Sequence, residues 1–436
     1  MDIVQKQIFM KILKHTKILL AIMAVGVFSV ALTGCADKCD GELVYQANVP
    51  VYLSYTDLRK PIKAEAPRAL HKPAKIWIKN NTLFVVDLNT GFHVIDISNL
   101  NSPAAISFVQ VPGIADIAVK GDNLYADSFI DLLVFDVSNP SAPNLTKRVE
   151  NTFPYDPLRI EPKEGYPVIA AEESKGVVIA WKTEEVRDKS SCTGSGYFYY
   201  SFDGGMLANS TTNVAQNYYS QGGSLARFTL VGDYFYSVDN RNLLTFDVSN
   251  PLNPIRISSK NIGWNIETLI ASNNYLFIGS RTAMIIYGLS NPADPSFVAN
   301  FPHGNACDPV VVQGNTAFVT LRSGTFCQNT QNELQVIDIT NITNPSLIKT
   351  YPMTNPWGLG IDGKILAVCE SNFGVTVFNA QNTSNLTTIG TLSTKAKDVI
   401  MYQGRAIFMG DGGIQLMSYD ESGNFTPGGI IPIVLE

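Results

Sequence analysis

The stretch Leu132-Leu133-Val134-Phe135-Asp136-Val137-Ser138-Asn139-Pro140 decides the fold, because its pattern recurs along the chain. An apolar run typical of a buried strand is followed by Asp, an apolar residue, Ser or Thr, Asn and a nearby Pro. The residues at the anchor position of the copies are Asp96, Asp136, Asp247, Gly288, Asp338 and Asn379. Side-chain oxygens of Asp, Ser and Asn accept hydrogen bonds from nearby backbone N–H groups, and Pro cannot donate to a sheet. We therefore interpret the anchor Asp residues as strand-ending turn formers rather than catalytic carboxylates.

A second block precedes the anchors, and it predicts a tight hairpin. In Val119-Lys120-Gly121-Asp122-Asn123-Leu124 two apolar runs flank a Gly-Asp pair, which recurs at 232–233, and Gly-Asn stands at 314–315. Gly and Asn tolerate the positive φ angles that two-residue hairpin turns require. One unit thus holds four short strands in about 40 residues, which is the length of a propeller blade. The sequence predicts an all-β chain folded as a β-propeller.

These units resemble the LVIVD-repeat family of bacterial propellers, in the hairpin block 116–121, in 124–128 and in the strand Asp131-Leu132-Leu133-Val134-Phe135-Asp136. The resemblance covers roughly residues 76–419, and the units look like those of a lipoprotein branch of this family of the Bacteroidetes type. It implies a propeller fold and says little about function.

The number of blades follows from the number of units. Weaker copies near Trp181 and Tyr419 bring the count to eight four-stranded blades, with seven as the alternative. We expect the apolar stretch 44–55 to add a strand to the last blade and to close the ring, because an open ring leaves unpaired edges. The predicted organisation is a signal peptide at 1–34, a lipid-anchored tether at 35–43 and one propeller domain at 44–436, with an insertion at 188–223.

The N-terminus has the pattern of a lipoprotein signal. Basic residues precede a short apolar run at 18–31, which ends in Leu32-Thr33-Gly34-Cys35. This tetrapeptide resembles the lipobox of bacterial lipoproteins, which implies cleavage before Cys35 and acylation of that residue. Several acyl chains give stable membrane anchoring, whereas a single chain gives marginal binding. Ala36 after the Cys favours, by analogy with enterobacterial sorting, the outer membrane, on its periplasmic or surface face.

The remaining cysteines do not predict a metal site. The chain has six cysteines and no Cys-x-x-Cys pair or Cys/His cluster at zinc spacing. Cys307 and Cys327 are the candidate disulfide pair, because both fall within one unit of an exported protein. Cys369 lies in an apolar run and is predicted to be a buried thiol. No cofactor is expected.

The sequence gives little support for a catalytic function or for nucleic-acid binding. The net charge is −6, and outside the N-terminus no basic cluster exists to contact phosphates. Of the four histidines, His93 lies at a strand position and is expected to be packed, and His303 is expected to be a surface residue. No Gly-x-Ser-x-Gly motif accompanies them, and no phosphate-binding glycine motif follows a strand.

One set of aligned residues predicts a binding site. Residues leading into each innermost strand of a propeller line the mouth of its central channel, and alignment on the hairpin glycines, or the equivalent residue, puts Lys75, Asp116, Arg227 and Glu267 at one position. Asp308, Trp357 and Asp398 fall one residue earlier. Carboxylates around one axis suit a cation or a polar ligand; the alternative is a solvated polar rim.

The insertion combines Tyr, Ser, Gly and Asn, as adaptable binding loops do. It is either a contact surface for glycan or protein or a disordered excursion. The functional hypothesis is a non-catalytic envelope lipoprotein that acts as a binding scaffold for an envelope protein or glycan. The alternative is a divergent hydrolase or lyase that uses the channel-mouth carboxylates on glycan or peptide.

Overall fold

The computed structural model describes residues 43–188, 198–199, 220–222, 225–304, 309–323 and 332–434. The chain divides into two compact units, one of residues 1–49, 165–170 and 182–200, and one of residues 50–164, 171–181 and 201–436. The second unit contains seven sheets with the strand order of propeller blades. The span 44–436, predicted as one domain, covers parts of both units.

Each of the seven sheets contains four consecutive antiparallel strands. The first three have the strands β3 Pro73–Lys79, β4 Thr82–Asp87, β5 Gly91–Asp96 and β6 Ala104–Gln110; β7 Ile117–Lys120, β8 Asn123–Ser128, β9 Asp131–Asp136 and β10 Asn144–Val149; β15 Phe228–Val231, β16 Tyr234–Val238, β17 Asn242–Asp247 and β18 Ile255–Asn261. The next two have β19 Ile266–Ser272, β20 Tyr275–Ser280, β21 Ala283–Gly288 and β22 Ser296–Pro302; β23 Val310–Gln313, β24 Thr316–Leu321, β25 Glu333–Asp338 and β26 Ser346–Pro352. The last two have β27 Leu359–Asp362, β28 Ile365–Cys369, β29 Val375–Asn379 and β30 Thr387–Leu392; β31 Asp398–Tyr402, β32 Arg405–Gly410, β33 Gly413–Tyr419 and β34 Phe425–Pro432.

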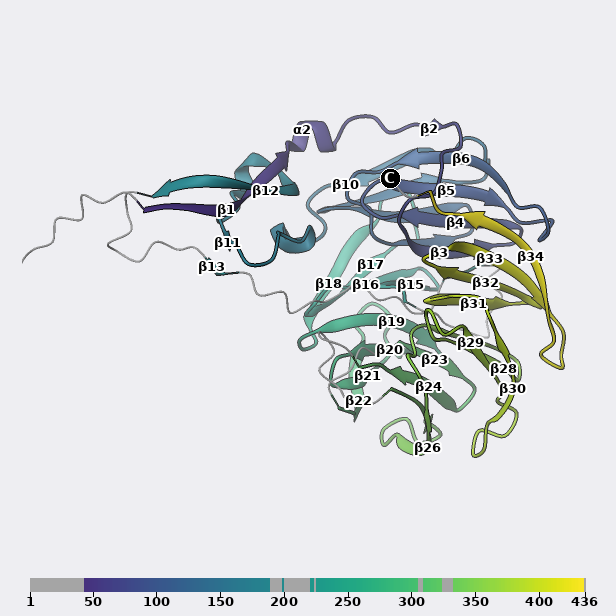
Figure 1. The fold of residues 1–436 in the computed structure, drawn as a ribbon. Helices are drawn as coiled ribbons and strands as arrows, with labels where there is room; N and C mark the ends of the chain where they lie inside the picture. The colour runs from purple at the N-terminus through teal and green to yellow at the C-terminus, as the bar shows by residue number, and fades with distance from the viewer. Residues whose placement is uncertain are drawn as a thin grey trace, which may run out of the picture. The chain divides into compact units, whose positions relative to one another are not determined.

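The sheets pack face to face in chain order, and the last packs on the first. Each neighbouring pair shares a cluster of buried apolar side chains. Ile76 and Ile78 of β3 belong to the same cluster as Ile400 of β31 and Ile407 of β32. Figure 1 shows the last sheet beside β3 and β4. Because each central strand is buried on both faces, it is a continuous apolar run, and each such Ile or Leu stabilises the fold by about 1.5 to 3 kcal/mol.

The two-residue hairpins form as the sequence predicted. In all seven sheets the residue directly after the innermost strand has a positive φ, and in the fourth and seventh sheets the second turn residue, Asn274 or Gly404, has one too. The first turn residues are Asn80, Gly121, Gly232, Asn273, Gly314, Gly363 and Gln403.

The anchor residues are turn formers, which confirms that prediction. Asp136 Oδ1 accepts a hydrogen bond of 2.9 Å from the Ser138 N–H, and Asp96, Asp247 and Asp338 make the same contact two residues on. This local hydrogen bond lowers the pKa of the partly exposed Asp136 carboxyl. In each sheet the pairing between third and fourth strands has a register irregularity close to the anchor, which twists the outer edge.

The first sheet is extended at both edges. At its outer edge β2 (Ala64–Glu65) pairs with β6, and at its inner edge β14 (Ser220–Gly222) pairs antiparallel with β3. In this pairing Ser220 lies opposite Lys79, Gln221 opposite Ile78 and Gly222 opposite Trp77.

The eighth sheet differs from the predicted third blade. The segment near Trp181 forms β12 (Val177–Asp188), which belongs to a sheet of order β12-β1-β11-β13 with β1 (Leu43–Leu53), β11 (Pro167–Val168) and β13 (Phe198–Tyr199). Here β1 runs parallel to β11, with Asn48 opposite Val168. Prolines at 154, 157, 162 and 167 and the 3-10 turns η1 (Pro157–Arg159) and η2 (Glu173–Lys175) interrupt the hairpin pattern that a blade needs. The total of eight sheets among the described residues matches the predicted eight units. The seven sheets with the strand order of a blade match the alternative prediction of seven blades.

The N-terminal strand does not close the ring as predicted. The last sheet already has four strands of its own, since the chain continues through β34, so β1 pairs in the eighth sheet instead. The ends of the blade series meet through the shared core and through a parallel bridge between Leu70 and Ile433. The one α-helix among the described residues is the short α2 (Tyr55–Leu58), and no helix there is long and apolar enough to cross a membrane.

Candidate functional site

Six of the seven predicted channel-mouth residues lie at the start of the innermost strands of six different sheets. Lys75 is in β3, Glu267 in β19 and Asp398 in β31, while Asp116 and Arg227 directly precede β7 and β15, and Trp357 stands two residues before β27. Asp308 lies outside the described residues. We call this end of the ring, where the innermost strands begin, the mouth.

The pairing registers correct the predicted alignment of Asp398. The first turn residue of the last hairpin is Gln403, not Gly404, since Tyr402 pairs with Arg405. Counted from that residue, Asp398 stands on the same step as Lys75 and Asp116, not one earlier. Glu267 stands one residue before the equivalent position, at a register irregularity between Ile266 and Thr268.

Lys75, Asp116 and Arg227 form a buried group. Lys75 Nζ lies 4.0 Å from Asp116 Oδ2 and donates a hydrogen bond of 2.8 Å to the Leu225 carbonyl oxygen. Asp116 Oδ2 accepts a bond of 2.6 Å from the Arg227 backbone N–H, and Oδ1 accepts one from the Ile117 N–H. Lys75 and Asp116 are each 3% exposed. Two of the predicted ligand-binding residues therefore hold the protein's own main chain.

Burial dominates the ionisation of this pair. It lowers the pKa of Lys75, and the Asp116 carboxylate opposes that shift; it raises the pKa of Asp116, and the Lys75 ammonium opposes that shift. Removal of one partner leaves a buried charge without compensation, which destabilises a fold strongly.

A second group continues around the mouth from Glu267. Arg281 Nε lies 3.1 Å from Glu267 Oε1, and the Arg322 guanidinium carbon stands 3.4 Å from the centre of the Trp357 ring. Burial raises the pKa of Glu267, opposed by Arg281 and the other nearby arginines, and burial lowers the pKa of Arg322 to about 10, opposed by the charge of Glu267. Glu267, Arg322 and Trp357 thus form one electrostatically linked series.

Glu267 Oε2 and Trp357 Nε1 are buried without a hydrogen-bond partner among the described residues. One accepts and the other donates a hydrogen bond. A buried polar group left unsatisfied costs about 1 to 3 kcal/mol, so such groups call for a specific explanation such as a water or a bound molecule.

Sequence reasoning missed the charged residues at the end of the second strand of each unit. Arg281 and Arg322 complete the mouth, whereas Asp127 Oδ1 accepts hydrogen bonds from the Ala115 and Asp116 N–H groups. Glu370 likewise accepts from the Thr354 N–H. The available signal was a charged residue closing each second strand, at 87, 127, 239, 281, 322, 370 and 411.

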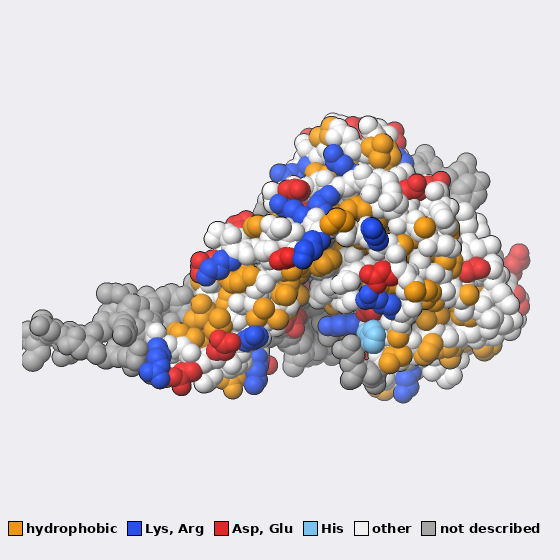
Figure 2. All heavy atoms as spheres, turned by 90° about the horizontal axis from the view of Figure 1, so that it is seen from above, with side chains coloured by type: hydrophobic (Ala, Val, Ile, Leu, Met, Phe, Trp, Pro, Cys, Tyr) orange, Lys and Arg blue, Asp and Glu red, His pale blue; other side chains and the backbone are white. Residues whose placement is uncertain are grey.

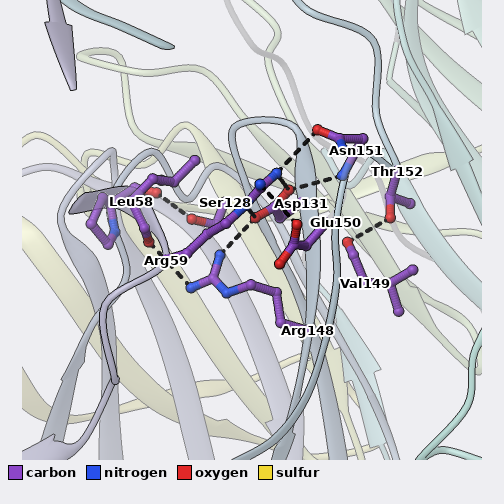
Figure 3. A network of polar contacts seen from close by, with 10 residues as sticks. Leu58, Arg59, Ser128, Asp131, Arg148, Val149, Glu150, Asn151 and Thr152 are labelled. Carbon is purple, nitrogen blue, oxygen red and sulfur yellow. Dashed lines mark hydrogen bonds and ion pairs between the residues drawn. The ribbon is translucent and has the colours of Figure 1, made fainter. Parts of the chain in front are cut away.

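A further polar network holds α2 on the second sheet (Figure 3). Asp131, whose side chain is 0% exposed, lies 3.0 Å from both Arg59 Nε and Arg148 Nη1, and it accepts from the Asn151 N–H. Arg148 also donates to the Leu58 carbonyl oxygen, and Arg59 reaches Glu150 at 2.8 Å. These contacts satisfy the carboxylate on all sides, which marks the network as structural.

Within the described ranges no group of three or more His, Cys, Asp or Glu side chains is placed to hold a metal ion. His93 is 2% exposed, its Nε2 lies 3.3 Å from Asp87 Oδ2 and its ring packs on Phe108, which confirms the prediction of a packed residue. His303 is half-buried, and its Nδ1 lies 2.8 Å from the Gly304 carbonyl oxygen. On the face in Figure 2, lysine and arginine side chains lie among acidic and hydrophobic ones and form no continuous basic patch.

Several predicted features lie outside the described residues: the signal peptide, the lipid-attachment residue Cys35, the pair Cys307 and Cys327, and most of the insertion at 188–223. Cys369, in contrast, is a free thiol that is 0% exposed, as predicted.

A family model described as the LVIVD repeat matches residues 72–110, 113–151, 222–261, 266–302 and 303–353. The chain contains five LVIVD repeats. These LVIVD repeats correspond one to one to the first five sheets of the ring, from β3 to β26. The prediction of LVIVD repeats is confirmed, and the sheets β27–β30 and β31–β34 follow the matched region.

No curated protein matches the chain. Among solved structures, a computationally designed protein, Ika8, is similar with a TM-score of 0.50 at 9% identity, over 84% of this chain and 91% of the other. A periplasmic gluconolactonase of Pseudomonas aeruginosa has a TM-score of 0.49 at 9% identity, with 84% and 98% covered. A functionally unknown protein of Desulfotomaculum acetoxidans has a TM-score of 0.46 at 11% identity, with 84% and 100% covered. At these identities the likeness concerns the fold alone.

Proposed function

We propose that the protein is a non-catalytic cell-envelope lipoprotein that acts as a binding scaffold, and that its mouth binds a polar ligand. The observation that carries the proposal is the pair of buried atoms Glu267 Oε2 and Trp357 Nε1, which have no hydrogen-bond partner among the described residues and belong to side chains that both interact with Arg322. Binding sites typically combine aromatic side chains with a few well-placed polar groups. An acceptor, a donor and a stacked guanidinium suit a ligand rich in hydroxyl or amide groups, such as an envelope glycan.

The binding test uses substitutions that remove one buried polar group each. The purified protein is applied to an array of bacterial envelope oligosaccharides and compared with Glu267→Gln, which keeps the side-chain shape, and with Trp357→Phe, which keeps an aromatic ring and removes the N–H donor. We expect one class of oligosaccharide to bind, with an affinity that falls at least about fivefold in both variants, since a lost buried hydrogen bond costs about 1 to 3 kcal/mol. Trp264→Phe is the matched control, because Trp264 is 63% exposed. Equal losses in the control, or binding that neither variant changes, contradict the assignment of the mouth.

The alternative is an enzyme that uses the mouth carboxylates on glycan or peptide. It is supported by the burial of Glu267, which is 3% exposed. Burial raises the pKa of this carboxyl, as a general acid working near neutral pH requires. Incubation of the protein with polysaccharide and peptide panels, with and without divalent metal ions, separates the two. Turnover that Glu267→Gln abolishes replaces the scaffold proposal with the enzymatic one.

The envelope location rests on the lipobox-like Leu32-Thr33-Gly34-Cys35. Metabolic labelling of cells with an alkyne-bearing palmitate tests it: label on the wild-type protein and none on Cys35→Ser supports lipid anchoring. Label retained by Cys35→Ser, or a wild-type protein without label, contradicts it. Protease treatment of intact cells then distinguishes surface display from a periplasmic orientation.

A further inference from the structure

The side chain of Arg227 stands at the mouth without a counter-ion among the described residues. It makes one hydrogen bond to a described residue, from Nε to the Glu267 backbone carbonyl oxygen over 3.4 Å, which is longer than the usual range. Its two Nη groups have no hydrogen-bond partner in the described part of the chain, and the residue is half-buried. The guanidinium therefore has donors left for another molecule.

Two other arginines at this end of the ring are paired. Arg281 Nε lies 3.1 Å from Glu267 Oε1. Arg159 Nη2 contacts Asp127 Oδ2. Glu267 thus has a counter-ion of its own, whereas Arg227 has no carboxylate within ion-pair distance among the described residues.

Neighbouring sheets hold the backbone at Arg227 in place. Asp116, at the start of the second sheet, accepts a hydrogen bond of 2.6 Å from the Arg227 N–H. The Leu269 N–H of the fourth sheet donates to the Ala226 carbonyl oxygen over 3.0 Å. The guanidinium is therefore presented from a fixed point beside Glu267. A group that is positioned before its ligand arrives loses less entropy on binding.

A guanidinium with open Nη groups suits one class of ligand group. Its planar fork of N–H donors matches two oxygens of a carboxylate or a phosphate, and such charge-assisted hydrogen bonds are roughly twice as strong as neutral ones. Burial lowers the pKa of Arg227, opposed by the charges of Glu267 and Asp116, yet an arginine stays charged in a protein. A charge removed from water without a partner costs free energy, and an anionic ligand group offsets that cost.

We propose that Arg227 binds an anionic group of the ligand, a carboxylate or a phosphate, so that the mouth selects acidic over neutral oligosaccharides. This inference rests on the proposed glycan-binding function and names the ligand class. Arg227 holds the acidic group, while Glu267 Oε2 and Trp357 Nε1 receive hydroxyl or amide groups of the same ligand.

Matched pairs of oligosaccharides test the selection. Uronic-acid oligosaccharides are compared with their carboxyl-reduced forms, and phosphorylated ones with their dephosphorylated forms, so the pair that responds identifies the anionic group. We expect the acidic member of one pair to bind the wild type at least about tenfold more tightly than its neutral counterpart, because hydrogen bonds between charged groups are the strong ones. Arg227→Gln keeps the backbone N–H that Asp116 binds and should abolish this difference. Arg241→Gln is the matched control, because Arg241 is exposed and stacks on Trp264.

The outcomes separate this inference from the proposed function. Binding that Glu267→Gln weakens, but that is equal for acidic and neutral members, supports the proposed function and overturns the selection by Arg227. An acidic preference that survives in Arg227→Gln, or that Arg241→Gln also removes, overturns the selection as well. If neither member of any pair binds, both proposals fail.

Thermal unfolding of Arg227→Gln tests whether the residue is merely structural. The substitution breaks no ion pair with a described residue and removes a charge that burial destabilises. The variant should therefore unfold at a temperature no lower than that of the wild type, as is common where a binding residue is removed. A clearly lower unfolding temperature would assign Arg227 to the framework of the ring and overturn the proposal.

Discussion

At the scale of single residues, the clearest prediction about the free energy of unfolding concerns Asp131. Its carboxylate is fully buried between Arg59 and Arg148, whose side chains are 21% and 10% exposed. Asp131→Ala leaves two arginines without their counter-charge, and breaking such a pair costs about 3 to 5 kcal/mol. Urea denaturation should show this loss of unfolding free energy. The control is Asp122→Ala, which breaks the exposed pair with Lys79 and should cost less than about 1 kcal/mol; equal losses would contradict a structural role for the network.

A second prediction concerns the reactivity of the Cys369 thiol at raised pH. Burial raises the pKa of its thiol well above the ordinary value, and the nearby Asp398 and Glu370 add to the shift. The reactive thiolate therefore stays scarce in the folded protein as the pH rises, while the unfolded chain ionises near its ordinary pKa of about 8.5. Iodoacetamide at pH 9, followed by peptide mapping, should leave Cys369 unmodified in the native protein and alkylate it in urea. Rapid native labelling at Cys369 is inconsistent with its burial.

At the scale of elements, the turn before β29 depends on a glycine. Gly374 has a φ of +100°, and a Cβ there would stand 2.3 Å from the Leu392 carbonyl oxygen. Gly374→Ala should therefore destabilise the protein by about 1 to 3 kcal/mol in thermal or urea unfolding. Gly390 in the neighbouring β30 has open space around the equivalent atom, so Gly390→Ala should cause no such loss. A neutral Gly374→Ala would show that this turn adapts freely.

The elements that the sequence predicts correctly are those that depend on local contacts. The hairpins and the Asp136-type turns depend on residues within a few positions of one another, so the sequence pattern contains them. The pairing partner of β1 does not follow from any local pattern, because the segment 44–55 is apolar whichever sheet it joins. The mouth was predicted in part: Lys75 and Asp116 follow from the alignment of the innermost strands on their hairpins. Arg281 and Arg322 directly follow second strands, which that alignment did not consider. That Lys75 binds the Leu225 carbonyl oxygen depends on a contact between residues 150 positions apart.

At the scale of the whole molecule, the account depends on the seventh sheet packing against the first. Every channel-mouth residue is brought to one place only if the blade series turns back on itself. The contacts that join its ends are the mixed cluster around Ile76 and Ile400, and the bridge from Leu70 to Ile433. Loss of either should separate residues that are adjacent here although they stand at opposite ends of the blade series.

Cross-linking across the ring ends tests this most directly. Leu70→Cys and Ile433→Cys are introduced together, with Cys39, Cys192, Cys307 and Cys327 replaced by Ser, and the oxidised protein is mapped by mass spectrometry. The account predicts a disulfide joining residues 70 and 433 in most molecules, and none after unfolding in urea before oxidation. A folded protein in which these two cysteines remain unlinked would contradict the ring.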